Sequence, residues 1–305
     1  MSEELRWGFP IALYLFVGGM SAAAYYVGVF ADLIGKDRYK EVARIGSYIV
    51  LIPIIIGLLM LVVDLGRPLR FWHLMLQLGP VNTGIIIRPG SVMSLGTWFL
   101  VAFSAVCGVA YPLMWLAKER FASNIPVLSA LAEKDDIRRA VGVLGLPIAF
   151  LVAIYTGVLL AVSSRPIWAD TVLLPVLFVI SATSTGIAAI ILLLSLSKSG
   201  AHHEVRRLEK GDNFMIKLEL VFVAILAIAL FISPRAIGAI KNVMVGDFAV
   251  FFWLGFIAAG LLIPFNIQRF GLQNSSLSTK GLAVTSSVLV LLGGFFLRFI
   301  VLIAA

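Results

Sequence analysis

An aspartate and two arginines follow directly on one of the longest apolar runs of the chain. Asp64, Arg67 and Arg70 lie in the stretch LVVDLGRPLRFWHLML, which covers residues 61–76. Lys, Trp and Tyr are the usual residues where a helix leaves a bilayer, so an acid is less expected at such a place. A carboxylate at the edge of an apolar segment is suited to accepting and releasing protons. The alternative is a local ion pair between Asp64 and Arg67, three residues apart.

A phenol and a guanidinium interrupt other apolar segments at a similar depth. With the rise of an α-helix, Asp64, Tyr155 and Arg298 lie about 28, 22 and 27 Å from the opposite ends of their helices. Three helices are therefore expected to bring an acid, a phenol and a guanidinium to one level. A place in an interfacial aromatic belt is the alternative for Tyr155.

Glu219 lies at a different depth, about 10 Å into its apolar segment and in the inner third of the span. An ionisable group at a helix centre costs about 2.5–3.5 kcal/mol to insert, so such residues tend to be functional. We take Glu219 as a candidate for a proton path from the cytoplasm. An ion pair in the inner leaflet is the alternative.

The chain that positions these residues is far more apolar than a soluble protein. Of its 305 residues 61% are hydrophobic and 13% are charged, whereas soluble domains contain about 45–50% apolar and about 25% charged residues. A bilayer core needs about 20 apolar residues per helix. Eight segments meet this length: 8–34, 42–63, 92–117, 140–163, 173–197, 213–233, 247–267 and 281–304. The sequence therefore predicts an all-α integral membrane protein with eight transmembrane helices in a single membrane domain.

The lysines and arginines indicate the orientation of these helices. The loops after the first, third, fifth and seventh helices carry 15 of them, and the other side carries 7. Because cytoplasmic loops are enriched in Lys and Arg, this split predicts that both termini lie outside. The net charge of +8 follows from the same excess of Lys and Arg in the predicted cytoplasmic loops. The sequence has no basic helix interleaved with aromatic residues, so it gives no indication of binding to nucleic acid.

Four arginines on the predicted outer side adjoin a proline. They lie in the pairs Arg67-Pro68, Arg88-Pro89, Arg165-Pro166 and Pro234-Arg235. Since proline ends helices and restricts its neighbours, these guanidinium groups are expected at one depth. They either reach lipid headgroups or form a cationic rim over a pocket or a docking surface.

Histidine and cysteine limit the redox groups that the chain itself could hold. The single cysteine, Cys107, lies in an apolar run, and the three histidines are His73 and the pair His202-His203, which we expect in a cytoplasmic loop. A membrane haem needs histidines on facing helices, and iron–sulfur clusters need several cysteines. The sequence therefore predicts no haem and no metal in this chain.

A quinone fits the chemistry of the edge residues, because it dissolves in lipid, carries carbonyl oxygens and exchanges protons together with electrons. A proton-coupled secondary transporter would use the same residue types. Its charges are expected near the midplane, in repeat-related broken helices, whereas here the ionisable residues gather at the edges. A purely structural anchor that binds lipid and no quinone is the other alternative.

Six segments, in a fixed order and spacing, carry a resemblance to a known family. They are WGFPIALYLFVGGMSAAAYYVG (7–28), DLGRPLRFWHLM (64–75), SVMSLGTWFL (91–100), YTGVLLAVSSRPIW (155–168), LPVLFVISATSTG (174–186) and GGFFLRFIVLIA (293–304). With them the chain resembles the NrfD/PsrC-type membrane subunits, including the polysulfide reductase membrane anchor. The resemblance covers most of the length of the chain.

The resemblance implies an eight-helix subunit of two four-helix bundles in the plasma membrane of a prokaryote. It implies that menaquinone or ubiquinone binds near the outer face, with no haem in this chain. It also implies that electrons pass between the quinone and a separate four-cluster, ferredoxin-like iron–sulfur subunit. That subunit is expected to bind a catalytic subunit, often of the molybdopterin type.

Single residues take expected roles from this resemblance by position. Asp64 matches an acid at the end of the second helix, a proton acceptor for quinol, and Tyr155 matches a tyrosine placed at the quinone. Arg165 and Arg298 match recurring basic positions. In its outer half the first helix offers Tyr14 and two glycines but no histidine or acid, so members with such a ligand there would bind quinone differently.

Arg67, Arg70 and His73 complete the predicted quinone site through their closeness to Asp64. We expect quinol between the first four helices, where Tyr155 donates a hydrogen bond to a ring oxygen and Asp64 accepts a proton as electrons leave outward. The apolar loop LGPVNTGIIIRPG at 78–90 is expected to help dock the iron–sulfur subunit.

Overall fold

The computed structural model describes residues 8–65, 68–78, 85–86, 91–117, 135–162, 171–197, 202–273 and 280–303. Within these residues, eight helices are long and apolar enough to cross a membrane. In chain order they are Phe9–Gly35 (α1), Lys40–Asp64 (α2), Val92–Leu116, Asp135–Ala161 (α6), Leu173–Leu196 (α8), His203–Ile232, Phe251–Gln273 and Lys280–Ile303 (α12). The prediction of an all-α membrane protein with eight spans is confirmed.

Two of the spans contain π-helical turns. The third span consists of α3 (Val92–Phe103), the π-helix η3 (Ser104–Ala110) and α4 (Tyr111–Leu116). The seventh begins with the π-helix η5 (Phe251–Leu262) and continues as α11 (Ile263–Gln273). A π-helix bonds each residue to the fifth one along instead of the fourth. The side chains that follow are therefore rotated relative to a regular helix, so their faces do not follow from a period of 3.6 residues.

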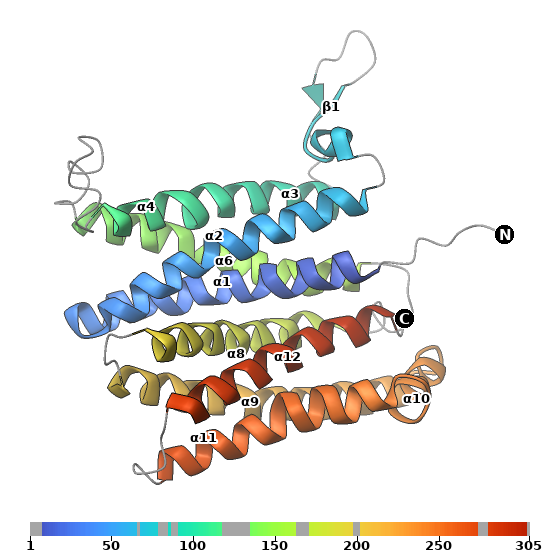
Figure 1. The fold of residues 1–305 in the computed structure, drawn as a ribbon. Helices are drawn as coiled ribbons and strands as arrows, with labels where there is room; N and C mark the ends of the chain where they lie inside the picture. The colour runs from blue at the N-terminus through green and yellow to red at the C-terminus, as the bar shows by residue number, and fades with distance from the viewer. Residues whose placement is uncertain are drawn as a thin grey trace.

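The two ends of the molecule are named here by the helices that reach them. The outer end is the end at which α1 begins and α2 and α12 end, and the inner end is opposite (Figure 1). At the outer end lie η2 (Pro68–Leu74), the antiparallel strands β1 (Gln77–Leu78) and β2 (Ile85–Ile86), and α10 (Ile237–Val245). At the inner end, η1 (Lys36–Tyr39) joins α1 to α2. That the outer end faces the outside of the cell stays a prediction.

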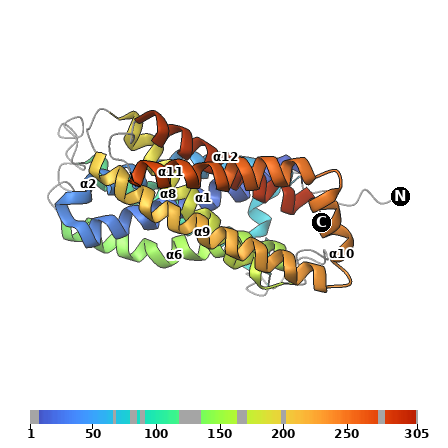
Figure 2. The same cartoon turned by 90° about the horizontal axis from the view of Figure 1, so that it is seen from below.

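α1 and α8 form the centre of the molecule (Figures 1 and 2). α1 packs against α2, α6, α8 and α12, and α8 packs against α1, α6, α12 and α9 (His202–Ile232). In the most apolar stretch of α1, 78% of the residues are buried inside the protein, against 22% in the sixth span. Because α1 and α8 contact helices of both halves of the chain, the division into two four-helix bundles stays a prediction.

Small residues allow the close packing around α1. A Cβ on Gly46 of α2 would lie 2.7 Å from the carbonyl oxygen of Ala24 and 3.0 Å from the Cα of Gly28. A Cβ on Gly186 of α8 would lie 2.7 Å from the amide nitrogen of Ala24. Membrane helices associate through van der Waals packing rather than through the hydrophobic effect, so such small side chains at the contact let the backbones approach.

A buried ion pair joins α1 to α6 near the inner end. Nη1 of Arg138 donates a hydrogen bond to the carboxylate of Asp32 at 2.6 Å, and each side chain is 2% exposed. The guanidinium also lies 4.0 Å from the ring centroid of Trp115. The sequence predicts that this span begins at residue 140, which leaves Arg138 in the preceding loop. That prediction is wrong, because α6 begins at Asp135, and its acidic first turn is favourable at a helix N-terminus.

α9 also begins earlier than the sequence predicts. Its first residue is His202, so the prediction that His202 and His203 lie in a loop is wrong. Val205 and Leu208 of this first part pack against a cluster around Ile187 of α8. The charged residues between them lower the average hydropathy, and a hydropathy window therefore ends the span too early.

Candidate functional site

Two tyrosines from different helices lie close together towards the outer end. Tyr14 of α1 is 1% exposed and Tyr155 of α6 is 8% exposed. The two phenols are near enough to interact electrostatically. The hydroxyl of Tyr14 has no hydrogen-bond partner among the described residues. A buried polar group without a partner costs about 1–3 kcal/mol, so this hydroxyl is suited to bonding with a bound molecule.

Glycines of the two neighbouring helices give the phenols their room. A Cβ on Gly57 of α2 would lie 3.4 Å from the ring of Tyr14. A Cβ on Gly96 of α3 would overlap both the ring and the hydroxyl of Tyr155. Each tyrosine therefore packs directly against the backbone of another helix. The pair is enclosed by α1, α2, α3 and α6.

Asp64 is the last residue of α2 and is half-buried. It follows Gly57 by two helical turns, about 10 Å further towards the outer end, and so lies on the same face of α2. Gly57 contacts Tyr14, so the carboxylate belongs to the helix face that covers this tyrosine, on its outer side. Asp64 therefore lies about two helical turns outward of the contact between Gly57 and Tyr14, at the outer end.

The segment after Asp64 covers this region with aromatic and basic residues. η2 packs against the ends of α2 and α3. Within it, Nδ1 of His73 lies 3.2 Å from the carbonyl oxygen of Arg70, and the ring of Trp72 stacks on the imidazole with centroids 3.7 Å apart. Arg70 is exposed. Arg67 and Arg165, which the sequence predicts here, lie outside the described residues, as does most of the loop at 78–90.

Arg298 belongs to a different group of residues from the one that the sequence predicts. Its Nη1 donates hydrogen bonds to the carbonyl oxygen of Gly294 at 2.7 Å and to the hydroxyl of Ser181 at 3.3 Å. Side chains on a helix point back towards its N-terminus, and α12 begins at the inner end. The guanidinium therefore lies about one turn deeper than its Cα. The rise along the helix alone had placed it level with Asp64 and Tyr155.

Glu219 is the acidic partner of this guanidinium. It lies on α9, is 2% exposed, and accepts a hydrogen bond from Ser181 of α8. Arg298 is fully buried and interacts electrostatically with Glu219. Ser181 thus stands between an acid and a base, and α8, α9 and α12 each contribute one member of this buried group.

A second buried acid lies on the same face of α9, nearer to the inner end. Asp212 is 0% exposed and accepts hydrogen bonds from Ser184 of α8 and Gln268 of α11, each at 2.6 Å. Glu209, one turn earlier, is 5% exposed, and its Oε2 has no partner among the described residues. Together with Glu219, these acids form a line along α9 from the inner end towards Arg298.

No metal site is apparent in the part of the chain that the structure describes. Within those residues, no group of three or more His, Cys, Asp or Glu side chains is placed to hold an ion. Cys107 is buried in η3 and its thiol lies 3.6 Å from the carbonyl oxygen of Gly145. The two groups of residues described above offer carboxylates, phenols, hydroxyl groups and a guanidinium group.

Comparison with known proteins assigns the family. The family model described as "Polysulphide reductase, NrfD" matches residues 1–305. The chain belongs to the NrfD family. It is 30% identical to a polysulfide reductase chain from Wolinella succinogenes, over 98% of this protein and 93% of the relative. It is 27% identical to protein NrfD of Escherichia coli, over 99% of this protein and 95% of that one.

A more distant relative has a different substrate in its name. This selenate reductase subunit from Mesobacillus selenatarsenatis is 23% identical, over 100% of the present protein and 75% of the relative. The NrfD resemblance that the six segments carry is confirmed over the whole length. With its eight apolar helices, this NrfD protein is a multi-pass membrane protein.

Sequence reasoning missed several residues of the buried line in this NrfD protein. Hydropathy places Asp212 only at the boundary of a span, and it gives no reason to consider Ser184 or Gln268. The spacing of the acids was the available signal, because Asp212 and Glu219 are seven residues apart and so lie on one helix face. Their serine and glutamine partners come from other helices, which no local pattern reveals.

Proposed function

We propose that this NrfD protein is the quinone-reactive membrane anchor of a respiratory oxidoreductase complex. Two of its relatives are named as parts of polysulfide and selenate reductases, which supports a place in a complex of this kind. The catalytic metal centre would then lie in a partner subunit, of the molybdopterin type. A four-cluster, ferredoxin-like iron–sulfur subunit would connect that centre to the quinone, either menaquinone or ubiquinone.

The buried hydroxyl of Tyr14, which has no partner among the described residues and lies beside Tyr155, carries this proposal. A phenol donates one hydrogen bond, and the carbonyl oxygen of a quinone accepts one. Tyr39, near the inner end, also has a buried hydroxyl without a partner in the described part of the chain. The surroundings of Tyr14 differ from those of Tyr39 because they include a second phenol, an acid on the adjoining face of α2, and glycines of α2 and α3. The residues present therefore fit a quinone head.

The residues divide the work between holding the ring and moving protons. When bound, the quinone supplies redox chemistry that couples electrons to protons. The hydroxyls of Tyr14 and Tyr155 hold the ring by donating hydrogen bonds to its oxygens. Asp64 accepts a proton at its carboxylate and releases it at the outer end. Arg70 and His73 of η2 would line the outer approach. Quinone binding by Arg67, Arg165 and Arg298 stays a prediction.

η2 is the part of the outer end best suited to dock the iron–sulfur subunit. Leu69, Phe71 and Trp72 are 88%, 46% and 40% exposed. Exposed apolar clusters of this kind mark sites of protein association. η2 follows Asp64 directly and leads into the strands of the predicted docking loop, so a partner bound here lies next to the quinone site.

A proton path through Glu219 forms the second part of the proposal. The line of Glu209, Asp212 and Glu219 leads from the inner end to Arg298, and hydroxyl groups of α8 contact both Asp212 and Glu219. Buried ionisable residues in membrane spans often form such relays. Glu219 would hold a proton arriving from the cytoplasm, and Arg298 would stabilise the carboxylate after the proton has left.

Quinone content of the intact complex tests the proposal. The native complex is purified with wild-type protein, with Tyr14→Phe or with Tyr155→Phe, and the quinone extracted per complex is measured. Each variant removes one hydrogen bond worth about 0.5–1.5 kcal/mol, so affinity should fall about 2- to 12-fold. Tyr39→Phe is the matched control and should retain the wild-type content. Equal amounts of quinone in all samples would remove the two phenols from the quinone site, and no quinone in any sample would favour the structural anchor.

A further inference from the structure

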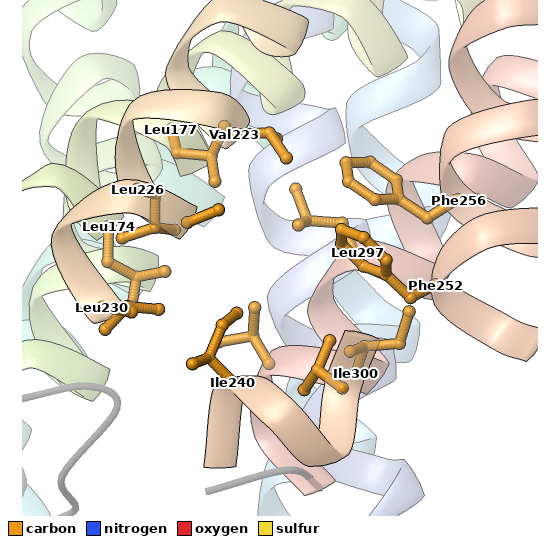
Figure 3. Close-up of a pocket in the computed structure, with 13 residues that line it drawn as sticks. Leu174, Leu177, Val223, Leu226, Leu230, Ile240, Phe252, Phe256, Leu297 and Ile300 are labelled. Carbon is orange, nitrogen blue, oxygen red and sulfur yellow. The ribbon is translucent and has the colours of Figure 1, made fainter. Parts of the chain in front are cut away.

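An apolar cavity lies between the helices of the second half of the chain (Figure 3). It encloses about 610 Å³ of empty space, including the part that opens outward. In Figure 3, Leu226 and Leu230 of α9 face Phe252 and Phe256 of η5 across the gap, with Ile240 of α10 at one end. α8 and α12 contribute the remaining walls.

All the side chains that line the cavity are apolar, which excludes a quinone head. The lining residues are Leu174, Leu177, Val223, Leu226, Ala227, Leu230, Ile240, Val243, Phe252, Phe256, Leu297, Ile300 and Val301. A carbonyl oxygen placed here would have no donor, whereas the region around Tyr14 offers two phenols. The cavity is therefore suited to a hydrocarbon chain.

The cavity is accessible from the lipid side of the protein. Val223 and Ala227 of α9 and Val301 of α12 are only partly buried, and the cavity opens to the surface of the protein. Protein interiors are packed nearly as densely as organic crystals, so a gap of this kind is expected to be filled. In a bilayer, the molecules that can fill an apolar gap open to the lipid are the acyl chains of phospholipids. The cavity is narrow and is too small for a partner helix.

Two cations lie at the outer end of the cavity, where a lipid headgroup would be. α10 lines the cavity with Ile240 and Val243, and Lys241 of the same helix is exposed. Arg235, in the turn before α10, is exposed as well. Asp247 follows α10 and offsets one of the two charges. The predicted outer side carries few lysines and arginines, so two of them beside one cavity favour an anionic ligand.

We propose that the cavity holds one acyl chain of an anionic phospholipid of the outer leaflet. Arg235 and Lys241 bind the phosphate, and the acyl chain extends along α9 towards Phe256. The acyl chain fills the space between α9, η5 and α12 and contacts α10 on the side of that helix that faces the inner end. This site is separate from the region of Tyr14 and Tyr155, and the proposal does not depend on quinone binding.

Lipid retention by the intact complex tests the proposal. The purified complex is delipidated in detergent and exchanged with phosphatidylglycerol or phosphatidylcholine of the same acyl chains, and the lipid retained per complex is measured by mass spectrometry. Each cation near an anionic lipid contributes about 5-fold in affinity. Arg235→Gln with Lys241→Gln should therefore lower the preference for phosphatidylglycerol about 25-fold. Arg269→Gln with Lys280→Gln, exposed at the inner end, should leave that preference unchanged.

A second pair of variants tests the cavity itself. Ala227→Phe places a ring in the cavity and should abolish retention of the lipid, whereas Ile228→Phe, on the next, exposed position of α9, should not. Quinol turnover of both variants should match the wild type, which shows that the complex is assembled. The proposal is overturned if Ala227→Phe retains the lipid, if both phospholipids are retained equally, or if quinone is displaced by Ala227→Phe in place of phospholipid.

Discussion

Replacing Gly96 of α3 by alanine tests whether the ring of Tyr155, which belongs to α6, must pack against α3. The new methyl group would overlap the ring and the hydroxyl of Tyr155, so the ring has to turn away from α3. Overpacking of this kind costs about 1–3 kcal/mol. We expect the displaced phenol to lose the proposed hydrogen bond to the quinone, worth about 0.5–1.5 kcal/mol. Quinone binding by the purified complex should then weaken about 2- to 12-fold.

Gly108 of η3 provides the control for this substitution. A Cβ there would meet its nearest neighbour at 3.7 Å, an ordinary van der Waals contact. Gly108→Ala should therefore leave the quinone content unchanged, although it makes the same chemical change in the same span. The double variant Gly96→Ala with Tyr155→Phe should bind quinone no worse than either single variant, because both act on one hydrogen bond. Additive losses, or wild-type quinone content in Gly96→Ala, would refute this reasoning.

Three further substitutions test other parts of the protein. Asp64→Asn should keep quinone bound but lower quinol turnover about 100-fold or more, since general acid–base groups contribute at least that much; Asp247→Asn is the control, and equal turnover would exclude Asp64 as proton acceptor. Glu219→Gln should keep quinol oxidation in detergent and reduce proton uptake by sealed vesicles, and unchanged uptake would remove Glu219 from the path. Arg138→Gln leaves Asp32 buried without its partner and should destabilise the protein by about 3–5 kcal/mol, which a lower thermal midpoint would reveal and Asp32→Asn should largely reverse.

The eight spans followed from the sequence because each is an apolar run that is long enough to cross a bilayer. Averaging hydropathy over a window failed to predict helix ends where a helix extends beyond the bilayer. The first turns of α9 alternate charged residues with Val205 and Leu208, and packing against α8 rather than hydropathy makes them helical. α10 was not predicted either, because it is too short to give a membrane signal.

The candidate site was predicted unevenly, for a physical reason. The position of Tyr155 and Asp64 near one end could be predicted, because the depth of a residue along a helix follows from the rise per residue. Arg298 was grouped wrongly because a long side chain on a helix reaches about a full turn from its Cα. Asp212 was missed because its partners, Ser184 and Gln268, belong to helices that only the folded chain brings together.

The central place of α1 has a consequence for how the chain is inserted during synthesis. α1 is made before the other seven described spans, yet it is the most completely buried of the eight. Its most apolar stretch also has a lower mean hydropathy, 1.5, than that of the sixth span, 2.6. Until α6 is made, the carboxylate of Asp32 has no guanidinium to meet it, and the glycine and alanine faces of α1 have only α2 to cover them. The nascent chain therefore has to keep α1 beside the insertion machinery, or paired with α2 as a hairpin, while the other helices emerge.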